Sequence, residues 1–268
     1  MPLFQLVLVA LIQGITEFLP VSSSGHLILL PGLTGLKDQG QVIDVAVHVG
    51  TLAAVLIYFW SDVREGLAGL PRALTGRLDT PGSKLAMGLI IATIPTVLFG
   101  AILHFTGLSH SLRSMAVIGW TMLGFGLVLY WADQKGAEVK QSSDWGIRDA
   151  LIMGLWQMLS LIPGTSRSGI TITGARQLGY TREDGARIAM LMSIPTIIAS
   201  GVLLGTEAAL EANTALMRDA GIAAALAMLS ALAALSLMMR LLRSVSFTPY
   251  VIYRVILGII LLSIAYGS

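Results

Sequence analysis

The sequence predicts an all-α polytopic membrane protein with an inverted-topology repeat, made of six transmembrane helices and two re-entrant helical hairpins. Of the 268 residues, 55% are hydrophobic and 12% are charged, and that charged fraction is about half the fraction of a soluble domain. The apolar residues lie in blocks that match the bilayer core at a rise of about 1.5 Å per helical residue. Two of these blocks carry polar residues and helix breakers at their centres.

Composition also excludes other classes of protein. Long apolar runs take the place of the alternation typical of a β-barrel. The absence of cysteine excludes a disulfide scaffold, a thiolate metal site and a cysteine nucleophile. A net charge of +2, interleaved with acidic residues, does not indicate a nucleic-acid partner. The first apolar stretch begins at Leu3 without a basic region before it, so we expect it to belong to the mature fold.

The chain begins with an interrupted stretch, 3–33, and a second one follows at 147–178. Each flank of these two stretches is too short to cross a bilayer alone, so we expect two hairpins that enter the membrane and turn back. The mixed-charge stretch 62–84 is expected to be a solvated cytoplasmic connection. Six further stretches are long and apolar enough to cross as single helices: 42–61, 85–105, 114–132, 184–205, 216–239 and 248–266.

An internal repeat relates the two hairpins. A shift of 144 positions places Gln13 on Gln157 and Gly25 on Gly169. Each hairpin is followed by three crossings, and an odd number of crossings inverts the second half relative to the first. The single membrane domain is therefore expected to comprise a first repeat, 1–134, and a second inverted repeat, 147–268.

Basic residues support the same topology. If both hairpins return to the side they entered, one side receives three basic residues, Lys37, Arg113 and Arg218. The other side receives twelve: Arg64, Arg72, Arg77, Lys84, Lys135, Lys140, Arg148, Arg176, Arg182, Arg187, Arg240 and Arg243. Because basic loops stay in the cytoplasm, we expect both termini and the mouth of the first hairpin to face outside.

The first interruption holds a carboxylate at membrane depth. Gln13 and Glu17 are four residues apart, so they share one face of a helix. An intramembrane carboxylate is costly and marks a candidate functional site. Glu17 could pair with an arginine to lock the fold, or it could serve as a metal ligand or general base. One carboxylate beside a carboxamide suits Mg²⁺ or Ca²⁺ with several retained waters.

Three serines and a histidine follow Glu17. One of Ser22, Ser23 and Ser24 would be an ordinary helix N-cap, but three hydroxyls at a helix N-terminus also indicate an anion site. His26, just after Gly25, can act as a base, an acid or a nucleophile near neutral pH. A lone histidine in an apolar protein is nevertheless more often a packing residue.

The second interruption carries an arginine in place of the acid. Arg167 stays protonated and needs an anion, which could be Glu17 or a phosphate held by two parallel hydrogen bonds. The convergence of two helix N-termini with these groups predicts a site for a diphosphate and a metal ion. The candidate binding residues around Arg167 are Gly164, Thr165, Ser166, Ser168, Gly169 and Thr171.

Two polar residues of the crossing helices are expected to be structural. His48 lies within the 42–61 stretch and is expected to pack or to form a helix–helix hydrogen bond. Arg254 lies one to two turns inside the last stretch and is expected to snorkel to the cytoplasm.

The motifs Gln13–His26 and Pro163–Thr171 resemble the two signature motifs of bacterial undecaprenyl-diphosphate phosphatases, the bacitracin-resistance family. The resemblance covers the whole chain in length, motif order and hydrophobic layout. It implies a multi-pass enzyme of the bacterial inner membrane, dependent on a divalent cation, with its active site toward the periplasm. This enzyme would hydrolyse undecaprenyl diphosphate to undecaprenyl phosphate and phosphate, which recycles the lipid carrier of cell-wall synthesis.

The same resemblance assigns roles to individual residues. The family's arginine falls on Arg167, its serine on Ser23 and its histidine on His26. Its first motif has Glu or Gln followed four residues later by Glu, so this chain has the one-carboxylate form, Gln13 and Glu17. We expect Arg167 to hold the phosphates and Glu17, with Gln13, to position a cation. Ser23 is expected to attack with His26 as base or acid, and direct attack by His26 is the alternative.

A membrane transporter is the main alternative function. Inverted repeats with sites at the membrane midplane are typical of transporters, and a flippase for lipid phosphates could use the same anion site. A nucleophile beside a base favours the enzyme, since a transporter needs only a binding site. The expected partners are the isoprenoid diphosphate and membrane lipid, without nucleic acid, and a homodimer is left open.

Overall fold

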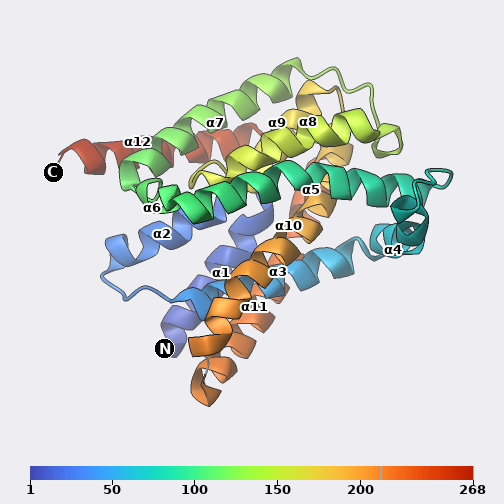
Figure 1. Cartoon of the computed structure of the whole chain (residues 1–268). Coiled ribbons are helices and arrows are strands. Elements are labelled where there is room, and N and C mark those ends of the chain that lie inside the picture. Colours follow the sequence, from blue (N-terminus) through green and yellow to red (C-terminus); the bar gives the residue numbers. More distant parts are fainter. Residues whose placement is uncertain (212, 268) are drawn as a thin grey trace.

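The structure is a computed structural model that describes residues 1–211 and 213–267 (Figure 1). Within these ranges six helices are long and apolar enough to cross a membrane, so the chain is a multi-pass membrane protein. Each overlaps one of the six predicted crossing stretches, which are thereby confirmed. They are α3 (Gln41–Tyr58), α5 (Pro81–Thr106), α7 (Met115–Lys135), the 182–203 part of α10 (Arg182–Glu211), α11 (Thr214–Leu241) and α12 (Thr248–Gly267).

The two interrupted stretches each form a pair of shorter helices around a break, as predicted. In the first, α1 (Leu3–Phe18) and α2 (Ser23–Thr34) flank the first break, residues 19–22. In the second, α8 (Ile147–Met158) continues into a short 3₁₀ turn, η2 (Leu159–Leu161), and α9 (Arg167–Gln177) begins after the second break, residues 162–166.

The two breaks have the same local geometry. Ser22 and Ser166 each precede a helix with a positive φ, 72° and 69°, a conformation that is costly for a residue with a Cβ atom. Each side-chain oxygen accepts a hydrogen bond from the backbone N–H three residues later, from Gly25 at 3.3 Å and from Gly169 at 3.1 Å. The serine caps therefore satisfy donors that the start of each helix leaves free.

The stretch 62–84 differs from its prediction as a solvated connection. Most of it forms a helix, α4 (Trp60–Leu74), which packs against α5. Gly69 lies so close to the backbone of Gly82 that a side chain there would collide with it. Small residues make this contact possible, but glycine and proline also lower helix propensity, which hid the helix in the sequence. Two short elements complete the chain, α6 (Leu108–Ser111) and η1 (Ser142–Asp144).

Helices from the two halves of the chain pack against each other throughout the molecule (Figure 1). Both α1 and α3 contact α11, α7 lies along α12, and α5 lies along α8. Gly14 of α1 and Gly50 of α3 approach the backbone of α11 so closely that neither position has room for a side chain. This packing, together with contacts of α9 with α7 and α10, holds the two breaks at the centre of the bundle.

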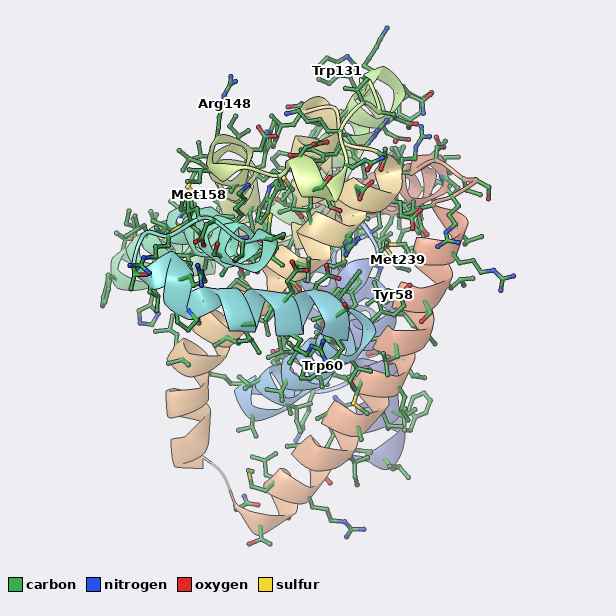
Figure 2. The ribbon with its side chains drawn as sticks, turned by 90° about the vertical axis from the view of Figure 1, so that its right-hand side faces the viewer. Tyr58, Trp60, Trp131, Arg148, Met158 and Met239 are labelled. Atoms are coloured by element: carbon green, nitrogen blue, oxygen red, sulfur yellow. The ribbon has the colours of Figure 1, made fainter. Side chains whose placement is uncertain are left out.

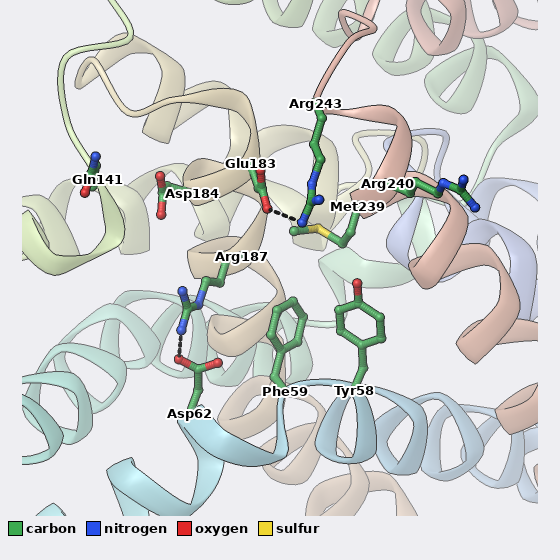
Figure 3. Close-up of a pocket in the computed structure, with 10 residues that line it drawn as sticks. All are labelled: Tyr58, Phe59, Asp62, Gln141, Glu183, Asp184, Arg187, Met239, Arg240 and Arg243. Carbon is green, nitrogen blue, oxygen red and sulfur yellow. Dashed lines mark hydrogen bonds and ion pairs between the residues drawn. The ribbon is translucent and has the colours of Figure 1, made fainter.

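A cavity of about 600 Å³ lies where α3 and α4 meet the ends of α10 and α11. Tyr58 of α3 and Met239 of α11 both line it and lie next to each other (Figures 2 and 3). Two ion pairs cross this region, Arg187 with Asp62 and Arg243 with Glu183. No predicted site residue lines the cavity, and its polar groups are separate from those at the breaks.

Candidate functional site

The two breaks meet at an ion pair. Glu17, near the end of α1, lies opposite Arg167, the first residue of α9, with 2.7 Å between Glu17 Oε1 and Arg167 Nη2. Their side chains are only 6% and 12% exposed. Two anionic partners were predicted for Arg167, Glu17 or a phosphate, and the structure pairs it with Glu17. Removing one member of such a buried pair leaves an uncompensated charge, so the two residues are strongly interdependent.

The second oxygen of Glu17 accepts two hydrogen bonds. Ser23 Oγ donates to Glu17 Oε2 at 2.6 Å, and Gln13 Nε2 donates to the same atom at 2.9 Å. The side chain of Ser23 is half-buried. A hydroxyl that donates to a carboxylate has a base in place to receive its proton when it attacks an electrophile. The structure therefore brings together Gln13, Glu17, Ser23 and Arg167, as the sequence predicted.

Two buried polar atoms of this cluster are unsatisfied. Among the described residues, neither Gln13 Oε1 nor Arg167 Nη1 has a hydrogen-bond partner. Buried polar atoms are nearly always paired in folded proteins, so each exception needs an explanation. One is an acceptor and the other a donor, and a bound anion together with a cation would satisfy both.

His48 lies at this site, whereas packing or a helix–helix hydrogen bond was predicted for it. Its Nε2 atom is 3.9 Å from Glu17 Oε2, and its side chain is 39% exposed. Its Nδ1 atom contacts the carbonyl oxygen of Asp44 at 2.7 Å, so its hydrogen bond is within α3. The sequence shows that His48 is inside a crossing helix, but not that this helix faces α1.

His26 lies on α2 with partners at both ring nitrogens. Its Nδ1 atom is 2.7 Å from the carbonyl oxygen of Ser22, and because a carbonyl only accepts, Nδ1 carries the hydrogen. In the neutral ring Nε2 then accepts from the hydroxyl of Tyr253, at 2.6 Å. Neither bond joins His26 to Ser23, so the structure pairs the predicted nucleophile with Glu17 and the predicted histidine with Tyr253.

The other two serine hydroxyls at the first break, those of Ser22 and Ser24, lie close to each other. Ser22 Oγ is the helix cap and lies 3.4 Å from Ser24 Oγ. Ser22 is buried, whereas Ser24 is exposed. Of the three serines, Ser24 is thus the most accessible to a ligand and Ser22 is the one that shapes the backbone.

The hydroxyls of the second break mostly bond within the protein. Ser166 caps α9, Ser168 donates to the carbonyl of Leu19 at 2.9 Å, and Thr171 donates to the carbonyl of Arg167 at 2.7 Å. All three hydroxyl-bearing residues are buried. The bond from Ser168 ties the second break to the first. Thr165 Oγ1 is buried without a partner among the described residues.

Gly164 turns the backbone of the second break. Its φ of 87° lies in the region that favours glycine, and a Cβ atom there would collide with Thr121 and with Ile118 of α7. The hydroxyl of Thr121 donates to the carbonyl of Pro163 at 2.6 Å. Gly164 therefore allows the break to lie directly on α7.

The prediction that Arg254 snorkels to the cytoplasm is wrong, because its side chain is fully buried. The face of α12 that carries Arg254 packs on α7 and points inward. There the carbonyl oxygens of the two breaks need hydrogen-bond donors, which a planar guanidinium supplies. Only its position inside an apolar span signalled this role. It donates to five carbonyl oxygens, those of Pro20 at 3.4 Å, Thr121 at 3.3 Å, Met122 at 3.2 Å, Gly164 at 3.1 Å and Thr165 at 2.9 Å.

The donor set for a metal ion is small. Residues 1–211 and 213–267 contain no group of three or more His, Cys, Asp or Glu side chains placed to hold a metal. The oxygen atoms of Glu17 and the unsatisfied Oε1 of Gln13 are hard ligands. They fit the mode in which Mg²⁺ is held by one or two carboxylates, by waters and by substrate phosphates.

The fold and this cluster define a class, a multi-pass membrane protein with a buried charged cluster where two broken helices meet. Residues 6–260 match the family described as bacitracin resistance protein BacA, and the chain belongs to this family. The family resemblance of the two motifs is thereby confirmed.

Relatives match over the full length of the chain. The undecaprenyl-diphosphatases of Ruegeria sp. (strain TM1040) and Ruegeria pomeroyi are 81% and 77% identical over 267 residues, which cover 100% of this chain and of each relative. The undecaprenyl-diphosphatase 1 of Rhodospirillum rubrum is 47% identical over 273 residues, covering 99% of this chain and 96% of its own.

Proposed function

We propose that this chain hydrolyses undecaprenyl diphosphate to undecaprenyl phosphate and phosphate at the cluster formed by Glu17, Ser23 and Arg167. The full-length relatives carry the name of that activity, and bacitracin resistance describes the family. The observation that carries the site assignment is the shared carboxylate. Glu17 accepts the Ser23 hydroxyl at 2.6 Å through one oxygen and pairs with Arg167 at 2.7 Å through the other.

The proposal includes the topology predicted from the sequence. The two helix pairs would be re-entrant hairpins of an inverted repeat, which the matching caps at Ser22 and Ser166 support. The uneven distribution of basic residues would place both termini and the substrate site toward the periplasm. Arg148, which projects outward from α8 (Figure 2), would then lie on the cytoplasmic side of an inner-membrane protein.

Substrate binding would use the groups that lack partners. Arg167 Nη1 is free to donate to a phosphate oxygen while Nη2 stays on Glu17. The N-terminus of α2, with the exposed hydroxyl of Ser24, provides a second set of donors for a phosphate. The buried hydroxyls of the second break would hold the backbone in place, and the isoprenoid tail would extend sideways into the bilayer.

The reaction would begin with attack of Ser23 Oγ on the terminal phosphorus. The proton of the hydroxyl passes to Glu17 Oε2, and the bond from phosphorus to the bridging oxygen breaks, releasing undecaprenyl phosphate. Water then attacks the phosphoserine, both hydrogens of the water leave on the phosphate, and Glu17 returns the proton to Ser23. Direct attack by His26 has less support, because both of its ring nitrogens are engaged.

A divalent cation, Mg²⁺ or Ca²⁺, is also part of the proposal. Glu17 and Gln13 Oε1 would hold it together with phosphate oxygens of the substrate. When bound, it would offset negative charge on the phosphoryl group that is transferred, which is the main requirement of such reactions. Binding would also satisfy the buried amide oxygen of Gln13.

The test is phosphate release from undecaprenyl diphosphate by purified protein in detergent, with Mg²⁺, with Ca²⁺ and with chelator. Arg167→Ala and Glu17→Gln should each lower the rate by about 10²- to 10³-fold, the usual cost of losing a group that stabilises transition-state charge or a positioned general base. Arg187→Ala, at the separate cavity, is the matched control and should keep near-normal activity. Normal activity of Arg167→Ala would contradict the site assignment. No release by folded wild type would favour the lipid-phosphate flippase instead.

A further inference from the structure

Tyr253 of α12 holds a residue of the site that is distant in the sequence. We propose that Tyr253 is a positioning residue, whose hydroxyl holds the His26 ring in one orientation and one tautomer beside the first break. The proposal rests on the proposed function only for its activity measurement. Its structural part can be tested without turnover.

The contact between the two rings is close and well oriented. Tyr253 Oη lies 2.6 Å from His26 Nε2, a distance typical of a strong hydrogen bond from a hydroxyl. The two rings are nearly parallel, at 8°, with centroids 5.7 Å apart. On the opposite edge of the imidazole, Nδ1 is bonded to the carbonyl of Ser22 at 2.7 Å. The ring therefore cannot flip or turn without losing both hydrogen bonds.

The two bonds together select one tautomer. The Ser22 carbonyl requires the hydrogen on Nδ1, so Nε2 has the free lone pair and the phenol is the donor. A histidine with its hydrogen held by a backbone carbonyl keeps the other nitrogen available as a proton acceptor. Tyr253 thus stabilises the tautomer with its hydrogen on Nδ1, in which Nε2 is the nitrogen that would receive a proton if His26 acts as the base.

The location of Tyr253 separates this role from a folding role. Its side chain is 44% exposed, whereas the next residue, Arg254, is fully buried and bonded to both breaks. A single hydrogen bond makes only a small net contribution to folding stability, so the fold should tolerate its loss. The helix α12 therefore anchors the break backbones through one residue and positions His26 through its neighbour.

The first experiment measures activity of Tyr253→Phe, which removes the hydroxyl and keeps the ring. We expect kcat to fall about two- to tenfold, the range for one lost hydrogen bond, with KM and the melting temperature close to wild type. Tyr250→Phe is the matched control, because it removes a hydroxyl one turn earlier on the same helix. It should leave kcat unchanged.

The second experiment observes the ring directly by ¹⁵N NMR of protein labelled at histidine. The chain has only four histidines, and His26→Gln identifies the signal of His26. In wild type we expect hydrogen on Nδ1 and a hydrogen-bonded acceptor at Nε2. In Tyr253→Phe the Nε2 resonance should move toward that of an unbonded acceptor, while Tyr250→Phe leaves it in place.

The outcomes distinguish this inference from the proposed function. Hydrogen found on Nε2 of wild-type His26 would overturn it, as would normal kcat in a Tyr253→Phe protein whose Nε2 resonance has moved. An inactive wild type would refute the phosphatase proposal alone, because the NMR result decides the tautomer independently. A Tyr253→Phe protein that fails to fold would contradict the separation of positioning from stability.

Discussion

Replacement of Arg254 by methionine tests whether one buried guanidinium holds the two breaks together. Methionine has a similar length and keeps the apolar packing against α7, but it has no hydrogen-bond donor. Five carbonyl oxygens lose a partner. Two of them, on Thr121 and Met122, lie within α7 and can still accept from the helix.

The magnitude follows from the other three carbonyls. Those of Pro20, Gly164 and Thr165 lie in the breaks, and in the described part of the chain their only bonds are to Arg254. Each buried acceptor left without a partner costs at least about 1 kcal/mol. We therefore expect Arg254→Met to lower the free energy of unfolding by about 3 kcal/mol.

The assay is unfolding by sodium dodecyl sulfate in mixed micelles, followed by tryptophan fluorescence and circular dichroism. Arg240→Met, at an exposed position of α11, is the control and should change stability by less than about 0.5 kcal/mol. Phosphate release by the same variants should fall for Arg254→Met alone, because the breaks separate. If the two variants unfold at the same detergent fraction, the guanidinium does not hold the breaks together.

Two further predictions concern groups outside the breaks. Burial, and secondarily the hydrogen bond to Asp149, raises the pKa of Tyr180 well above its usual range. Because the folded state holds the Tyr180 proton more tightly than the unfolded chain does, this group stabilises the fold. The stabilisation is complete below pH about 10 and is lost as pH rises further. Melting temperatures measured between pH 9 and pH 11, about one unit on either side of the ordinary tyrosine pKa, should therefore fall more for wild type than for Tyr180→Phe. An equal fall in the two proteins would contradict this prediction. Asp62→Asn breaks the ion pair with the partly exposed Arg187. It should lower the free energy of unfolding by less than about 1 kcal/mol in the same detergent assay, and a larger decrease would show that the pair is not solvated.

Much of the fold could be predicted because single segments determine it. The 85–105 stretch has no acidic or basic side chain except His104, so its crossing follows from length and apolar composition alone. Pro20 and Pro163 end their helices through a local steric effect. In both cases the information lies within about twenty residues of sequence, on the scale of one bilayer crossing.

The missed features depend on which helix faces which. Arg254 bonds to residues 20, 121 and 164, and no local pattern relates such distant positions. The same holds for His48 beside Glu17 and for Tyr253 beside His26. Helix α4 was missed for a different reason, because the glycines that allow it to approach α5 are themselves poor helix formers.

The close approach of α1 and α3 to α11 has a consequence for how the chain assembles during synthesis. Gly14 and Gly50 fit against a helix that begins at Thr214 of 268 residues. A ribosome makes the N-terminal partner first, so these glycine faces enter the membrane long before the surface that covers them. The packing of α1 and α3 is therefore completed only after α11 has been synthesised.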